Sequence, residues 1–187
     1  MIGKRRKGAE ALIVEPLSLK EARGLSPELV AALAQAASVC FEHQGHSTGS
    51  VMEVDGDAAK RFAVLWDETT ELTRRSWADL QEATEWGAAS VAVALVPRLS
   101  GLTVVERSCK GTGFDYWLGA QDDNGALFQK KGRLEVSGIL SGSHGELGRR
   151  TREKVEQIDT YESPLAGIVV VVEFREPRSR VVLKWKK

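Results

Sequence analysis

Two acidic residues interrupt segments of this chain that are otherwise apolar and rich in β-forming residues. Asp115 stands in the segment 111–119 and Glu135 in the segment 133–140. Such segments normally exclude a charge unless something compensates it. If they pair as a hairpin, both carboxylates project from the same face at one end of a sheet. Two converging carboxylates can bind a hard divalent cation such as Mg²⁺, which promotes phosphodiester hydrolysis. The alternative interpretation is two solvated acids at strand ends.

The composition is that of an ordinary globular protein. The 187 residues are 42% apolar and 28% charged, enough for one domain with a substantial core. The 26 Lys and Arg residues balance the 26 Asp and Glu residues, so binding to nucleic acid would need a local basic patch. No signal peptide is visible, the two cysteines form no motif, and no apolar stretch is long enough to cross a bilayer. We therefore expect a cytoplasmic protein with no membrane partner.

The first part of the chain has the pattern of a helix followed by a hairpin. A Ser-Pro-Glu helix-start signal predicts a helix over 26–41. The segments 50–55 and 61–66 alternate between apolar and polar residues, with turn-forming residues between them. We interpret residues 1–72 as an N-terminal elaboration made of one helix and one β-hairpin.

The rest of the chain, residues 73–187, has the pattern of an α/β core. An apolar stripe at helical spacing predicts a helix over 73–96 that ends at Pro97. The order that follows is three strands, a helix and a strand, which predicts a mixed central sheet flanked by helices, in one compact unit with the N-terminal elaboration. These later elements are expected over 102–107, 114–118, 133–140, 146–160 and 167–174.

This element order, with Asp115 on the second strand and Glu-x-Ser at 135–137 on the third, resembles the PD-(D/E)xK superfamily of nucleases. That superfamily includes many restriction enzymes and Holliday-junction resolvases, and the resemblance covers residues 74–175. It implies a restriction endonuclease-like core in the order α-β-β-β-α-β. It also implies Mg²⁺ or Mn²⁺ as the cofactor and DNA as the partner.

The resemblance implies a set of metal ligands. Asp115 would be the first ligand and Glu135 the second, and Val136 would add its backbone carbonyl. A glutamate on the first core helix completes the site in many members. Glu85 or Glu82 would serve here, and we prefer Glu85 because it lies where the predicted helix turns from polar to buried.

The chain departs from the motif at one position, because Ser137 stands where the superfamily has its lysine. That lysine normally holds the attacking water and stabilises developing negative charge, which a neutral hydroxyl cannot do. The following helix offers Lys154 as a relocated lysine and Gln157 as a polar helper. Its arginines are candidates for binding the DNA backbone. They are Arg149, Arg150 and Arg152.

Two functions are therefore expected. The first is metal-dependent phosphodiester hydrolysis on DNA, in phage defence or mobile-element biology as for much of the superfamily. The second is a catalytically silent nuclease-like domain that acts as a protein- or nucleic-acid-binding subunit of an assembly, or as a homo-oligomer. The two acids in apolar strands favour the first function. The zero net charge and Ser137 favour the second.

Overall fold

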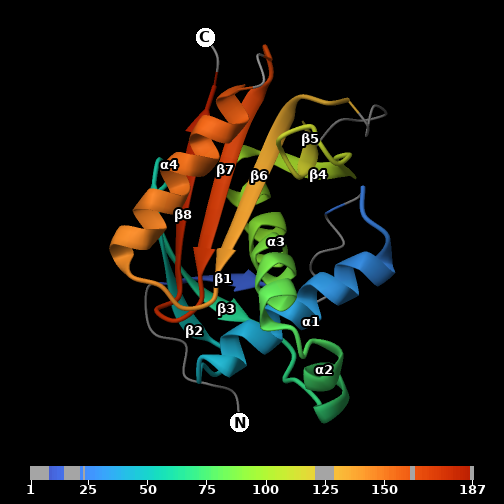
Figure 1. The fold of residues 1–187 in the computed structure, drawn as a ribbon, viewed down its shortest axis with the longest axis vertical. Coiled ribbons are helices and arrows are strands. Elements are labelled where there is room, and N and C mark those ends of the chain that lie inside the picture. The colour runs from blue at the N-terminus through green and yellow to red at the C-terminus, as the bar shows by residue number, and fades with distance from the viewer. Residues whose placement is uncertain (1–8, 15–21, 23, 121–128, 161–162, 186–187) are drawn as a thin grey trace.

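The computed structural model describes residues 9–14, 22, 24–120, 129–160 and 163–185, which form one eight-stranded sheet with helices packed against it (Figure 1). The predicted α/β class, with a mixed sheet flanked by helices, is confirmed. The helices are α1 (Pro27–His43), α2 (Glu71–Ser76), α3 (Leu80–Ser100) and α4 (His144–Thr160). The strands are β1 (Glu10–Ile13), β2 (Ser50–Gly56), β3 (Lys60–Leu65), β4 (Leu102–Arg107), β5 (Tyr116–Ala120), β6 (Gly132–Ile139), β7 (Ala166–Glu173) and β8 (Arg178–Lys184).

The strands lie in the order β1-β3-β2-β8-β7-β6-β5-β4. Strands β4, β5 and β6 form an antiparallel meander, and β7 pairs parallel with β6 after the crossover through α4. Strand β8 returns antiparallel to β7. From α3 onward the elements therefore follow the predicted order of helix, three strands, helix and strand, with β8 added at the end.

The central strand β7 is buried on both faces of the sheet. Its alternate residues point to opposite faces. Ile168 and Val170 pack in the larger hydrophobic cluster with α1 and α3, whereas Val169 and Val171 pack in a smaller cluster with residues of α4. Figure 1 shows α4 running alongside β7 and β8. A continuous β-branched run suits such a doubly covered strand.

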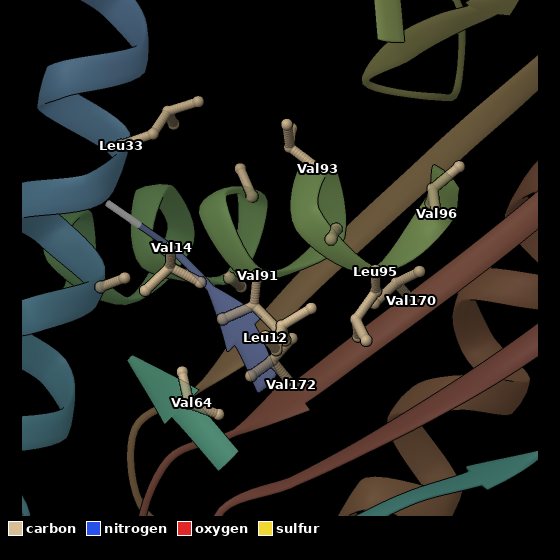
Figure 2. Close-up of a cluster of buried hydrophobic side chains, with 14 of the residues drawn as sticks. Leu12, Val14, Leu33, Val64, Val91, Val93, Leu95, Val96, Val170 and Val172 are labelled. Carbon is tan, nitrogen blue, oxygen red and sulfur yellow. The ribbon is translucent and has the colours of Figure 1, made fainter. Parts of the chain in front are cut away.

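Helices α1 and α3 pack closely on the face of the sheet opposite α4. Val91 of α3 belongs to the same cluster as Leu12 of β1 and Val172 of β7, as Figure 2 shows. Where the two helices cross, a Cβ on Gly87 would lie 3.1 Å from the Cα of Ala37. The absence of a side chain at Gly87 therefore allows this close approach.

The helix predicted over 26–41 is confirmed as α1, but the helix predicted over 73–96 is wrong at both ends. The chain forms α2, breaks, and starts α3 after Asp79. The Asp79 carboxylate accepts hydrogen bonds from two following backbone N–H groups, at 2.9 and 3.2 Å, and so caps a new helix. Pro97 does not end α3, which continues to Ser100. Pro97 lies in the last turn, where its missing N–H removes only one intrahelical hydrogen bond.

The two parts of the chain that were separated at residue 72 share this sheet. The hairpin of β2 and β3 joins the rest because β2 pairs parallel with β8, and β1 adds beyond β3. The sequence analysis predicted neither β1 nor β8, and residue 72 lies inside α2. At the junction Arg180 makes two hydrogen bonds of 2.7 Å to Asp55. In the described part of the chain, no helix is both long and apolar enough to cross a bilayer.

Candidate functional site

Asp115 and Glu135 lie side by side at the end of the hairpin formed by β5 and β6. The strands pair antiparallel, with Tyr116 opposite Leu134, so the next position along the ladder places Asp115 opposite Glu135. The backbone N–H of Asp115 donates to the Leu134 carbonyl at 2.9 Å, and its own carbonyl accepts from Ser108 at 2.7 Å. Directly opposed residues of an antiparallel pair point to the same face. The predicted hairpin is therefore present, and it brings the two carboxyls together.

Beyond Leu134, the edge of β6 that β5 covers elsewhere has no strand partner among the described residues. The Asp115 carboxylate takes the place of the missing strand, because its Oδ2 accepts a hydrogen bond of 2.8 Å from the Val136 N–H. The N–H and C=O of one strand residue point to the same side of the strand. The Val136 carbonyl therefore also points toward this unpaired edge, next to the Asp115 carboxylate.

Glu135 is the most deeply buried acid of the site, with 2% of its surface exposed. It points to the α4 face of the sheet, where the Lys154 ammonium lies 2.6 Å from its Oε1. Its second oxygen, Oε2, is buried and has no hydrogen-bond partner. A buried carboxylate oxygen without a partner is costly, so this atom marks a place where a proton or a cation would be stabilising.

The two carboxyls are close enough to share a proton. The pKa of Glu135 is raised to about 7, first by burial and then by the negative charge of Asp115, while Lys154 opposes both effects. The pKa of Asp115 is also raised, chiefly by loss of hydration. The hydrogen bond from the Val136 N–H and the positive charge of Lys154 lower it and so oppose this effect. Asp115 is exposed to solvent at the mouth of the cleft, whereas Glu135 is buried. The pair is therefore poised to hold a proton or a cation between its members.

Gln157 connects α4 to the loop that precedes Asp115. Its side-chain carbonyl accepts a hydrogen bond of 3.0 Å from Lys154, and its amide donates to the Gly113 carbonyl at 3.2 Å. Lys154 is therefore held between Glu135 and Gln157. The structure places both helix residues named by the sequence analysis beside the carboxyl pair.

Arg150, one turn before Lys154 on the same helix face, reaches Ser137. Its guanidinium donates a hydrogen bond of 3.2 Å to the Ser137 hydroxyl. The side chain is about one-third exposed and also lies 3.8 Å from Glu153. A cation from α4 thus lies next to Ser137 on β6.

The remaining candidates stand apart from the carboxyl pair. Glu85 is exposed on α3 and lines the same cleft, but no cluster of three His, Cys, Asp or Glu side chains able to hold a metal occurs among the described residues. Arg149 is exposed and ion-paired with Glu153, and Arg152 is exposed on the outer side of α4. Of the three arginines proposed to bind DNA, only Arg150 lines the cleft.

The donor set around the pair fits a hard divalent cation. It consists of two carboxyls, one of which has a bare buried oxygen, and a backbone carbonyl at an unpaired strand edge. Mg²⁺ prefers oxygen ligands, keeps several waters and is usually bound by one or two carboxylates. A site with few protein ligands therefore suits Mg²⁺ better than a cation that needs a full protein cage.

Comparison of the chain with protein-family models, with curated proteins and with solved structures found no match.

The sequence analysis missed two residues of the cleft, Arg107 and Trp86. The Arg107 guanidinium lies 5.7 Å from the centroid of the Trp86 ring, and both residues line the cleft that contains Asp115. Arg107 is the last residue of the strand predicted over 102–107, only a few residues before Asp115. A cation so near a candidate metal ligand in the chain could have been named as a site residue. Trp86 gives no such signal, because its neighbours in the cleft come from distant parts of the sequence.

Proposed function

We propose that this chain is a metal-dependent hydrolase of DNA phosphodiester bonds. The observation that carries the proposal is the Glu135 Oε2 atom, which is buried without a partner next to Asp115. A divalent cation shared by the two carboxyls would remove the cost of that arrangement. The order α3–β4–β5–β6–α4–β7 supports the proposal, because the resemblance to PD-(D/E)xK nucleases implies the same order.

Asp115, Glu135 and the Val136 carbonyl would hold Mg²⁺ or Mn²⁺. A cation bound there would polarise the phosphate and lower the pKa of a coordinated water. Asp115 is fixed for this role by its own backbone hydrogen bonds and by the Val136 N–H. Glu85 lines the same cleft and remains the candidate for a further ligand.

The cations of α4 would stabilise the negative charge that develops on the phosphate. Lys154 faces Glu135, and Gln157 orients its ammonium. Arg150 sits against Ser137, so it would supply the positive charge that the serine cannot. The role of the superfamily lysine is thus divided between two helix residues in this proposal.

Substitution of Asp115 by Asn tests the proposal. The purified chain is incubated with plasmid, duplex and single-stranded DNA in Mg²⁺, Mn²⁺ or EDTA, and Mg²⁺ binding is measured by calorimetry. We expect metal-dependent cleavage by the wild type, and at least about a 100-fold loss of rate together with weaker Mg²⁺ binding in Asp115→Asn. Glu156→Gln is the matched control, because Glu156 is an exposed acid of α4 outside the cleft. A wild type that neither cleaves DNA nor binds Mg²⁺ contradicts the proposal.

A second function has one observation in its favour. Lys154 already compensates Glu135 at 2.6 Å, so an ammonium stands near the place where an enzyme would hold its metal. A silent binding domain, associating with nucleic acid or with a protein partner, is consistent with this ion pair. In that case DNA binding in EDTA is unchanged by Asp115→Asn, and no product forms with any metal.

A further inference from the structure

Asp115, but not the buried Glu135, lines a cleft of about 790 Å³ that straddles the unpaired edge of β6. Along β6 it is lined from both faces of the sheet, by Val136 and Leu140 on one side and by Ser137 and Ile139 on the other. Its volume lies within the range of about 300–1,000 Å³ that is usual for sites that take small ligands. A volume of this size suits a nucleotide-sized group.

The two ends of the cleft differ in chemistry. Three cations line the cleft, Arg107, Arg150 and Lys154, together with the acids Asp115, Glu85 and Glu146. The side of the cleft formed by α1 and α3 combines apolar residues with the polar Gln81, Thr84 and Glu85. Its apolar lining residues are Leu29, Leu33, Leu80, Trp86 and Ala89.

A ligand that fits such a cleft carries a phosphate at one end and a flat apolar group at the other. We propose that the cleft takes an unpaired nucleotide, so that the substrate is single-stranded DNA or a frayed end and not an intact duplex. This inference rests on the proposed function, since it concerns the same site. It adds the form of DNA that the site can accept.

The base of an intact duplex is stacked and paired, so its faces are not available to a protein. A duplex docked at Asp115 would present phosphates to the cations and leave the apolar end unfilled. Single strands are instead bound by a positively charged groove combined with planar side chains on which bases stack. Arg107 and Trp86 offer such planar surfaces, with the guanidinium 5.7 Å from the ring centroid. Trp77 supports Trp86 from α3's N-terminal side, with the ring centroids 5.5 Å apart.

The test is binding measured by fluorescence anisotropy in EDTA, where no cleavage occurs. The probes are a labelled single-stranded oligonucleotide, a blunt duplex of the same sequence, and that duplex with a single-stranded tail. We expect the single strand and the tailed duplex to bind about tenfold more tightly than the blunt duplex. Equal affinity for the single strand and the blunt duplex would overturn the inference.

Two cleft variants locate the binding. Leu29→Glu places a charge in the apolar end, and Arg107→Ala removes an exposed cation, which keeps the test valid if Leu29→Glu folds poorly. Each is expected to weaken single-strand binding about tenfold, and Leu29→Glu is expected to leave duplex binding unchanged. Leu72→Glu and Arg75→Ala are the matched controls, because both residues are exposed on α2 outside the cleft. Binding that both cleft variants leave unchanged contradicts the inference.

Failure of the inference can be told apart from failure of the proposed function. Metal-dependent cleavage that Asp115→Asn abolishes, but that proceeds equally on duplex and single strand, retains the hydrolase and rejects the unpaired nucleotide. Single-strand binding that depends on Leu29 and Arg107, without cleavage in any metal, retains the nucleotide site and rejects the hydrolase.

Discussion

At the scale of single residues, Glu135 determines what the site can do. It is buried, it has one cationic partner in Lys154, and its other oxygen has none. Burial is the largest cause of its raised pKa, with the neighbouring Asp115 charge next. A carboxylate in this position destabilises the folded state when it is ionised and no cation is bound to it. Binding of either a proton or a metal ion should therefore stabilise the fold. The chemistry and the stability of the protein are therefore linked through one side chain.

Glu135→Gln should change how stability depends on pH in metal-free buffer. Because the folded-state pKa of Glu135, about 7, is above the ordinary value of 4.5, the folded state binds more protons than the unfolded state between these two values. The stabilisation from this group is complete below pH 4.5 and is lost as the pH rises through 7. Relative to the glutamine variant, the wild type should lose about 1–3 kcal/mol between pH 5 and pH 8. Urea unfolding in EDTA measures the difference.

Two further measurements complete this prediction. Mg²⁺ at pH 8 should restore the stability of the wild type but not of Glu135→Gln, because only the wild type keeps both carboxyls. Glu156→Gln should follow the wild type at every pH, since Glu156 is exposed on α4. A difference between wild type and Glu135→Gln that does not change with pH would refute the assignment.

At the scale of elements, the site depends on the close approach of β6 to the first half of α3. A Cβ on Gly138 would lie 2.4 Å from the backbone oxygen of Thr84 and 2.7 Å from its Cγ2. Only a glycine lets the strand and the helix lie this close. The same approach forms the cleft, because Gly138 and Thr84 both line it.

Gly138→Ala should therefore push β6 and α3 apart and destabilise the protein by about 1–3 kcal/mol, with loss of Mg²⁺ binding at the neighbouring carboxyl pair. The contact on the Thr84 side is backbone, which cannot move away as a flexible side chain would. Gly145→Ala is the matched control, because its nearest contact would be the Ser143 hydroxyl at 3.8 Å and it lies in α4. Thermal unfolding and calorimetry measure both effects, and a Gly138→Ala protein as stable as the control would contradict the account.

At the scale of the whole molecule, the N-terminal hairpin and helix are part of the same structure as the site. Close to half of the residues in the larger hydrophobic cluster come from the first 72 residues, including Leu33, Phe41, Met52 and Phe62. Helix α1 also supplies the apolar end of the cleft, through Leu29 and Leu33. The elaboration therefore completes both the core and the site.

A fragment of residues 73–187 should fail to fold cooperatively. Each large apolar side chain contributes about 1.5–3 kcal/mol on burial, so loss of several of them exceeds the 5–15 kcal/mol of net stability typical of a domain. We expect no cooperative thermal transition by circular dichroism and binding of a hydrophobic dye by the fragment. The full chain, treated in the same way, is the control. A sharp transition in the fragment would show that 73–187 is an independent domain.

The local signals in the sequence were sufficient for most elements. The Ser-Pro-Glu start of α1, the alternation in β2 and β3, and the β-branched run of β7 each depend on neighbours within a few residues, and each predicted the right element. The start and the end of α3 were predicted wrongly. Whether Asp79 caps a new helix, and whether Pro97 ends it, depends on which backbone N–H and C=O groups find hydrogen-bond partners in the folded chain. Strand β1 was missed because its partner β3 is distant in the chain, whereas β8 forms a hairpin with β7, a local signal that the sequence analysis did not use.

The sequence alone determined that the segments around Asp115 and Glu135 would pair, because both are β-prone and near each other in the chain, although Asp115 itself lies one residue before β5 and not on it. Only the tertiary structure decided their partners. Lys154 and Arg150 reach Glu135 and Ser137 because the α4 crossover lies over that face of β6, and the cleft exists because β5 ends where α3 approaches Gly138. The local charge, the burial and the pKa values at such a site depend on atoms from segments that are distant in the chain. The sequence does not give the distances between those atoms.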